Sequence, residues 1–289
     1  GARGTCCDFQ SMITEKGNAS GSAFKFPNTV YNAAGGYLSI CSGIKGYNVT
    51  VTNGAQSGLA SVAYAMSVLR SGQENAMLAT GSDENSDIMT ELFGKLGVTS
   101  EKVVAPFAGN DGFVLSDGSA SVLIEDEKSA KERGARIYCH VTGYGMAHSN
   151  VKFGTLTGSE AGLTNAVNNA LADAGMTIDD IDAVFGFANG MKAVDDVEIK
   201  GLTAVFGDKL AEKPVVELKE VLGESRAAAA TTAAAHAALM FAGKIPSQEA
   251  YSIAADGSVS KTKAEASKLN NVLVAAYGAG GSYTAIVLS

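Results

Sequence analysis

The sequence has few of the residues that build metal centres and disulfide frameworks. Its 289 residues include three histidines, four cysteines, four prolines and no tryptophan. The four cysteines, Cys6, Cys7, Cys41 and Cys139, show no CxxC spacing, and no histidine lies at the spacing of a metal ligand. We therefore expect reduced thiols, no metal and no cofactor.

Charge is also scarce. Charged residues make up 18% of the chain, and 22 basic against 30 acidic residues give a net charge of −8 without a basic cluster. Nucleic acids and anionic membranes attract basic patches, so neither is an expected partner. Residues 227–242 form the longest apolar stretch, which is too short to span a bilayer. Because the first residues lack the apolar core of a signal peptide, we expect a cytoplasmic protein.

What the chain does contain is a succession of short β-branched runs and amphipathic segments. Residues 48–52 and 76–80 predict two strands on either side of a helix over 55–70, which together would form a parallel βαβ unit. Residues 1–25 are polar and predict a loop or the remaining part of something larger. Residues 112–125 predict two strands around Asp117-Gly118, and residues 137–143 predict another strand.

A similar succession follows in the second half. The elements that it predicts are helices over 164–174, 196–206 and 227–242, a strand over 183–187, and a strand pair over 272–277 and 283–288. The glycines between the last two strands favour a tight turn, since no helix follows them to bind a phosphate. The two halves have a similar succession of predicted strands and helices. This similarity predicts an internally duplicated, layered α/β fold with a boundary near residues 144–157.

The segment TVTNGAQSGL, residues 50–59, has the pattern of a strand that turns sharply into a helix. A nucleophile is favoured at such a helix start, because the free amides and the helix dipole lower a thiol pKa and bind an oxyanion. Around this elbow the sequence resembles the β-ketoacyl synthases of the thiolase superfamily. Five ordered segments carry the resemblance: FPNTVYNAAGGYLSICSGIKGYNVTV, PFAGNDGFVLSDGSASVLIE, KSAKERGARIYCHVTGYG, VVELKEVLGESRAAAA and VAAYGAGGSYTAIVL.

The resemblance implies an α/β thiolase-like fold built from two halves with α-β-α-β-α layers. Residues 1–150 would form an N-terminal half and residues 151–289 a C-terminal half. Several strands and helices precede the nucleophile in the family, whereas only positions 1–54 precede Ala55 here. We therefore expect a truncated first half. Either the chain is a fragment of a longer protein, or it is a shortened variant that needs another chain to complete its sheet, because an uncovered sheet edge favours aggregation.

The resemblance also implies a catalytic cysteine, and this sequence departs from the family there. Matching without gaps from Thr50 puts Ala55 at the cysteine position, and a shift of one residue puts Gln56 there. Neither side chain can form a thioester.

Two histidines that hold the enolate of a malonyl extender are implied as well, and both are missing. The first corresponds to Phe187 or to Asn189, depending on the alignment of GFANGMK. In VVELKEVLGESR, Lys219 matches the lysine of the family and Glu224 occupies the second histidine position. A carboxylate would repel a developing enolate, which an imidazole stabilises.

These departures predict a ketosynthase-like subunit without condensing activity. It would act as the chain-length factor of an obligate heterodimer with a catalytic ketosynthase in type II polyketide or fatty acid biosynthesis. Acyl carrier protein with acyl or malonyl cargo would be the second partner. Some family members carry glutamine in place of the nucleophile, so the alternative is a malonyl-carrier decarboxylase or an atypical acyltransferase that uses Gln56. A degenerate fragment without a partner is a third possibility.

Overall fold

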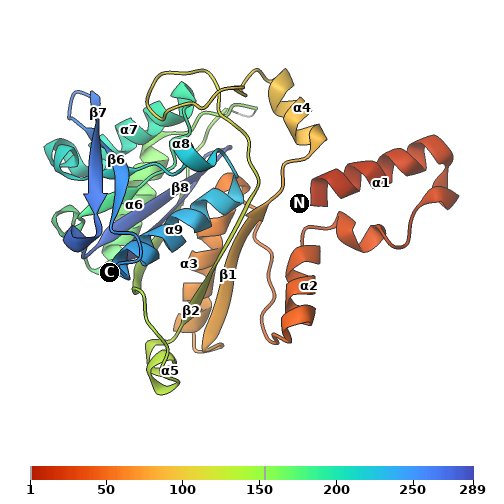
Figure 1. Ribbon diagram of the computed structural model, residues 1–289, viewed down its shortest axis with the longest axis horizontal. Coiled ribbons are helices and arrows are strands. Elements are labelled where there is room, and N and C mark those ends of the chain that lie inside the picture. Colours follow the sequence, from red (N-terminus) through yellow and green to blue (C-terminus); the bar gives the residue numbers. More distant parts are fainter. Residues whose placement is uncertain (1, 153) are drawn as a thin grey trace.

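A seven-stranded sheet forms the centre of the structure, a computed structural model that describes residues 2–152 and 154–289 (Figure 1). Its strand order is β3-β9-β8-β4-β5-β6-β7. β4 pairs in parallel with β8 and β5, and the other neighbours pair antiparallel. The strands are β3 (Val141–His148), β4 (Ala183–Phe185), β5 (Val215–Val216), β6 (Ser247–Ile253), β7 (Val259–Glu265), β8 (Val272–Gly278) and β9 (Ser282–Leu288).

Helices cover both faces of this sheet. α6 (Glu160–Ala174) and α7 (Lys192–Phe206) pack on one face, and α3 (Ser57–Arg70) and α9 (Ala227–Phe241) pack on the other. β8 is buried along its whole length, as expected of a strand covered on both sides. Two apolar cores result. One contains Leu163 and Phe206, and the other contains Leu59 and Ala237.

A second sheet lies on the far side of α3 and α9. It consists of β1 (Ala76–Asp83) and β2 (Gly118–Glu125), which pair antiparallel from Ala76↔Glu125 to Asp83↔Gly118. The layers are therefore helix, seven-stranded sheet, helix and two-stranded sheet. This arrangement agrees with the layered α/β fold that the sequence predicts.

Small residues allow α9 to lie very close to its neighbours. A Cβ atom added to Gly58 of α3 would lie 2.1 Å from the carbonyl oxygen of Ala227 and 2.3 Å from Thr231 Oγ1. A Cβ atom added to Gly81 of β1 would meet the same two atoms, at 2.5 and 2.3 Å. The first turns of α9 thus sit against backbone from both α3 and β1. The alanines of α9 support this approach, since they favour helix and add little bulk.

The segment before the elbow, residues 2–50, forms an arm that leaves the body and returns to it (Figure 1). α1 (Ala2–Lys16) leads away, and the chain comes back through η1 (Asn18–Ser20) and η2 (Phe26–Thr29) to α2 (Ala33–Ser42). The prediction of a loop over positions 1–25 is therefore wrong for the described part of that segment. The sequence there is polar and has no clear apolar face, but a long-range contact between Phe9 and Phe26, with ring centroids 5.7 Å apart, supports the helix.

The predicted βαβ unit is also wrong. Residues 48–52 form no strand, and β1 has an antiparallel neighbour. β-branched residues favour a strand only where a neighbouring strand is available, and these residues make no backbone–backbone hydrogen bond to any described residue.

The bounds predicted for two further strand segments differ from those in the structure. Of residues 112–125, only 118–125 form a strand, and the earlier part makes isolated bridges at Phe113 and Leu115. The strand expected over 137–143 starts at Val141, where its pairing with Leu288 of β9 begins. In both cases the partner strand, which the local pattern does not contain, fixes the boundary.

The remaining elements are short connections. They are η3 (Gly54–Gln56), α4 (Asp87–Lys95), α5 (Glu127–Glu132), η4 (Ile178–Asp180), η5 (Gly207–Glu212), α8 (Lys219–Leu222) and η6 (Ala266–Lys268). Within the described residues, every helix is too short or too polar to cross a bilayer.

The close approach of α3 to α9 predicts that Gly58→Ala destabilises the fold. The added methyl group would overlap a backbone oxygen that cannot move away, at a cost of about 1–3 kcal/mol in the free energy of unfolding. Gly94→Ala in α4 is the matched control, since a Cβ atom there meets no atom within 4 Å. Alanine at this exposed helical site should stabilise by about 0.5–1 kcal/mol. Urea denaturation of both variants measures the difference, and equal effects would contradict the proposed contact.

Candidate functional site

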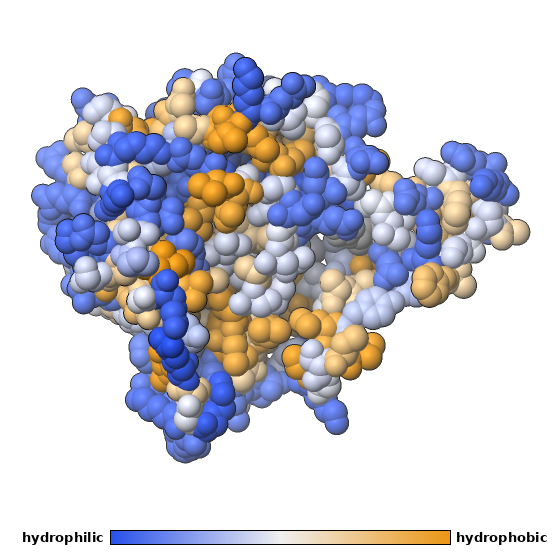
Figure 2. Space-filling view, in the orientation of Figure 1, coloured by the Kyte–Doolittle hydropathy of each residue, from blue (hydrophilic) through white to orange (hydrophobic). Residues whose placement is uncertain are grey.

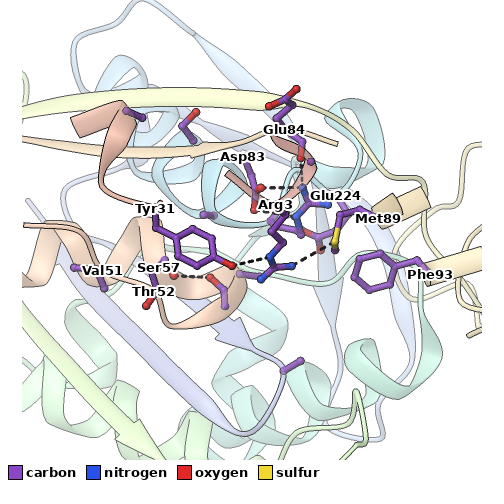
Figure 3. A pocket seen from close by; sticks show the side chains of 18 of the residues that line it. Arg3, Tyr31, Val51, Thr52, Ser57, Asp83, Glu84, Met89, Phe93 and Glu224 are labelled. Carbon is purple, nitrogen blue, oxygen red and sulfur yellow. Dashed lines mark hydrogen bonds and ion pairs between the residues drawn. The ribbon is translucent and has the colours of Figure 1, made fainter. Parts of the chain in front are cut away.

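A cavity of about 820 Å³ lies between the arm and the body (Figure 3). Its apolar wall comes from both parts of the chain. The arm contributes Val30, Tyr31 and Tyr37, and Val51 lies directly after the arm. The body contributes Met89, Phe93, Phe113, Phe187, Met191, Val194 and Tyr277. The two sides are linked by Arg3, whose Nε donates to Tyr31 Oη at 3.1 Å and whose Nη1 lies 3.5 Å from Met89 Sδ.

The elbow forms one end of the cavity. Gly54, at φ +72°, turns the chain into the start of α3, and Ala55 lines the cavity directly after it. A Cβ atom on Gly54 would make only an ordinary contact with Gly278 Cα, at 3.6 Å, so it is the positive φ that favours glycine here. The hydroxyl of Ser57 accepts from the amide of Asn53 at 2.7 Å and donates to the carbonyl of Gly54 at 2.6 Å, so it is already fully engaged.

Gln56 does not line the cavity. Its side chain is 1% exposed and turns into the core, where its Oε1 accepts a hydrogen bond from the hydroxyl of Thr284 in β9. Of the two positions that the sequence offers for the nucleophile, the structure therefore places Ala55 at the cavity and Gln56 behind it.

Phe187 and Asn189 follow the end of β4 and both line the cavity. The Phe187 ring packs against Tyr277 and Tyr283, with centroids 5.7 and 6.4 Å away. Asn189 Nδ2 donates to Glu224 Oε2 at 3.0 Å. Both candidates for the first histidine position thus reach the cavity, one with an apolar ring and the other with an amide.

Lys219 and Glu224 form a buried ion pair on the cavity floor. Lys219 Nζ lies 2.7 Å from Glu224 Oε2 and donates to the carbonyl of Phe187 at 3.0 Å, while Glu224 Oε1 accepts from the amide of Arg226 at 2.8 Å. Burial alone would raise the pKa of Glu224. The charge of Lys219 and the hydrogen bonds from Lys219, Asn189 and Arg226 outweigh burial, so the pKa is lowered overall. The structure brings Asn189, Lys219 and Glu224 together as one network.

Arg226 is a site residue that the sequence analysis missed. It occupies the N-cap of α9 at φ +51°, a strained conformation for a residue with a side chain. Its Nε and Nη2 each donate to Asp83 at 2.9 Å, and Nη2 donates to the carbonyl of Glu84 at 2.8 Å. No motif points to this pair, because Asp83 lies 143 residues earlier in the chain.

Asp195 is a second residue that was missed as part of the site. Its carboxylate accepts from the amides of Phe107, Asn189 and Gly190 at 2.7, 3.0 and 3.2 Å. Burial raises the pKa of Asp195, and these amide hydrogen bonds oppose the shift. Asp195 thereby holds the loop that carries Asn189. The clue in the sequence is the acidic pair Asp195-Asp196 at the start of the helix expected over 196–206.

The described cavity lining contains no cysteine and no histidine. Cys139 lies elsewhere, and burial raises the pKa of its thiol to about 11, which keeps it protonated. His236 in α9 is half-buried, and burial lowers its pKa. Among the described residues, no cluster of three or more histidine, cysteine or acidic side chains is arranged to hold a metal ion. The cavity therefore offers an apolar wall and a neutralised polar floor, and its described lining lacks a thiol with an imidazole base.

The Lys219–Glu224 pair generates a stability prediction. Lys219→Met leaves Glu224 buried without its cation and should lower the free energy of unfolding by about 3–5 kcal/mol. The double variant Lys219→Met, Glu224→Gln removes the charge as well and should recover most of this loss. Thermal and urea unfolding of both variants measure the two effects. Equal losses in the single and double variants would show that the ion pair does not cause the destabilisation.

Comparison with known proteins identifies the family of the chain. Residues 3–130 match the Beta-ketoacyl synthase N-terminal domain, and residues 138–252 match the Beta-ketoacyl synthase C-terminal domain. The 3-oxoacyl-[acyl-carrier-protein] synthase 2 of Vibrio harveyi is 30% identical over 214 residues, which are 71% of this chain and 52% of the relative. The chain thus spans about half the length of the curated relatives that it matches.

Two solved structures share the fold. The ishigamide ketosynthase/chain length factor has a TM-score of 0.86 at 23% identity, covering 99% of this chain and 72% of that chain. A type II polyketide synthase ketosynthase in complex with its acyl-carrier protein has a TM-score of 0.85 at 19% identity, covering 98% and 74%. The predicted thiolase-like ketosynthase fold is therefore confirmed. Since the two matched domains together cover most of the sequence, the chain belongs to the β-ketoacyl synthase family.

Proposed function

We propose that this chain is a non-condensing ketosynthase-like subunit that acts as the chain-length factor beside a catalytic β-ketoacyl synthase in type II polyketide or fatty acid biosynthesis. The observation that carries the proposal is the composition of the cavity. Ala55 lies at the helix start, and Asn189, Lys219 and Glu224 bond to one another where the family resemblance implies a lysine and two imidazoles. The described lining has no thiol that could take the acyl group as a thioester.

The charged groups on the cavity floor give a second reason against condensation, because they would not stabilise an enolate. An enolate is stabilised by hydrogen-bond donors or positive charge directed at its oxygen. Lys219 could supply such a charge, but its ammonium is occupied by Glu224 and by the carbonyl of Phe187. The role that remains for this cavity is to bind an acyl chain and to shape the space around it. The condensation reaction would take place in the partner subunit.

The wall of the cavity suits acyl cargo. Its volume of about 820 Å³ lies within the range of small-molecule sites, roughly 300–1,000 Å³. Aromatic and aliphatic side chains from the arm and the body line it, which favours an alkyl or polyketide chain. Because the arm provides part of the wall, a partner that holds the arm would also set the shape of the cavity.

The exposed apolar surface of the arm supports dependence on a partner. Hydrophobic side chains gather over α2 on the face shown in Figure 2. The exposed large hydrophobic residues between positions 24 and 49 are Phe24, Phe26, Val30, Tyr31, Tyr37, Leu38, Ile40, Ile44, Tyr47 and Val49. Apolar patches of this extent mark protein interfaces in soluble proteins.

Residues 48–52 add a second interface feature. They are β-branched at most positions and leave their backbone groups without a partner among the described residues. A strand from another chain could pair with them, as in other cases of strand addition. The net charge of −8 opposes an acidic carrier protein, so we expect the partner subunit to provide the surface on which the carrier docks.

The similar structures agree with these partners. One is described as a ketosynthase/chain length factor and the other as a ketosynthase in complex with its acyl-carrier protein. The decarboxylase alternative would need Gln56 at the thioester, and the burial of Gln56 against Thr284 gives that alternative no support.

Ile40→Asp tests the interface. Ile40 is 78% exposed on α2, and a carboxylate there should weaken binding to a coexpressed catalytic ketosynthase by about tenfold or more. Val221→Asp is the matched control, because Val221 is 79% exposed on α8, outside the arm. Pull-down followed by native mass spectrometry measures the one-to-one complex. If the unmodified chain recovers no ketosynthase from its own organism, the heterodimer proposal fails.

Gln56→Ala tests the decarboxylase alternative. We expect the parent and the variant to release carbon dioxide from malonyl-carrier protein only at the background rate. The variant should also lose about 1–3 kcal/mol of stability, because it leaves the buried Thr284 hydroxyl without its acceptor. Release by the parent that disappears in the variant would favour the alternative over the proposed function.

A further inference from the structure

Two glutamates lie buried behind the cavity floor and take no part in the site described above. Glu198 belongs to α7 and is 0% exposed, and Glu217 follows β5 and is 3% exposed. Neither lines the cavity. Fully buried carboxyl groups are rare unless they are paired, so this pair requires an explanation.

The two carboxyl groups are close to each other. A Cβ atom on Gly186 would lie 1.8 Å from Glu198 Oε1 and 2.0 Å from Glu217 Oε1, so these oxygens are at most about 3.8 Å apart. Glu198 Oε2 accepts from the amide of Phe187 at 2.8 Å. Glu198 Oε1 and both oxygens of Glu217 have no other hydrogen-bond donor among the described residues.

The surroundings do not neutralise two negative charges. Lys219 is the cation that acts on the pair, and it is already bonded to Glu224. Asp195 on α7 adds a negative charge, and Tyr251 on β6 directs its hydroxyl to Glu220 instead. No described cluster of side chains is arranged to hold a metal ion. A proton shared by the two carboxyl groups would give these oxygens a hydrogen bond and remove one of the two negative charges.

We propose that Glu198 and Glu217 share one proton and form a pH-sensitive latch behind the cavity floor, which loosens when that proton is lost. This inference rests on the geometry of the pair and not on the proposed function. The latch acts through Phe187, whose amide donates to Glu198 and whose carbonyl accepts from Lys219. With the proton present, the pair carries one negative charge and Lys219 stays with Glu224. Without the proton, the two carboxylates repel each other and compete with Glu224 for Lys219.

The pKa shifts of Glu198 and Glu217 determine how the stability of the fold depends on pH. Burial raises the pKa of Glu217 well above its usual range, and the charge of Glu198 adds to this effect. Burial also raises the pKa of Glu198. The folded chain therefore holds a proton at pH values where the unfolded chain has released it. Stability should fall as pH rises from the usual range of glutamate through the raised value, and level off above it.

Glu217→Gln provides the test. Its side-chain amide can still donate a hydrogen bond to Glu198, but it does not ionise between pH 5 and pH 8. We expect the melting temperature of the parent to fall by several degrees from pH 5 to pH 8 relative to this variant. Hydrogen exchange at the Phe187 amide should accelerate over the same range in the parent alone. Glu212→Gln, which removes an exposed carboxyl group, is the control and should follow the parent.

Two further measurements keep the test decisive. In the parent, difference infrared spectra should show a carboxylic-acid C=O band at neutral pH that is absent from Glu217→Gln and from Glu198→Gln. A parent without that band would overturn the proposal, even if both variants fail to fold. The proposal also fails if parent and Glu217→Gln lose stability in parallel with pH. Stabilisation of the parent by potassium chloride, but not by choline chloride, would assign the site to a cation and contradict the shared proton.

Discussion

The ion pair between Lys219 and Glu224 joins the segments that form the cavity floor. Lys219 begins α8, Glu224 precedes α9, and both bond to the loop after β4 through the carbonyl of Phe187 and the side chain of Asn189. A buried ion pair costs desolvation energy and persists only where its remaining hydrogen-bonding groups are satisfied. Here Asn189 Nδ2 and the amide of Arg226 supply the further donors to Glu224. The floor is thus fixed in one arrangement, and its polar groups are occupied with one another.

The two sides of the cavity are held very differently. On the body side, Arg226 accepts a strained φ of +51° because Asp83 and the carbonyl of Glu84 fix its guanidinium, and this ties β1 to the start of α9. Gly58 and Gly81 bring the same helix start against α3 and β1. On the arm side, largely exposed contacts connect the arm to the body: Arg3 reaches Met89, and Tyr47 donates to Gln73 and Glu74. A partner would therefore change the arm wall of the cavity and leave the floor in place.

The sequence predicts the parts of this structure in which local pattern and tertiary packing agree. The helix over 164–174 was found from its apolar periodicity, the helix over 227–242 from its alanines, and the last strand pair from two apolar runs around the 278–281 glycines. The arm helix α1 was missed because its sequence is polar and a distant residue, Phe26, supports it. Residues 48–52 were assigned to a strand on their β-branched side chains alone, although a strand also needs a partner. The site shows the same division. Motif resemblance pointed to Lys219 and Glu224, whereas Arg226 and Asp83 meet only through the fold.

In the proposed non-condensing role, the charges around Lys219 matter as well as the side chain at Ala55. The carboxyl groups of Asp195, Glu198, Glu217 and Glu224 all interact with Lys219, and the Arg226 guanidinium beside Glu224 is bonded to Asp83. A thiol introduced at Ala55 would gain from the start of α3, but Lys219, which is paired with Glu224, would add little stabilisation of its thiolate. An enolate would add another negative charge beside Glu224, with Lys219 already engaged. If the proposed function holds, condensation in this cavity would therefore require Lys219 to be released from Glu224 as well as a cysteine at Ala55.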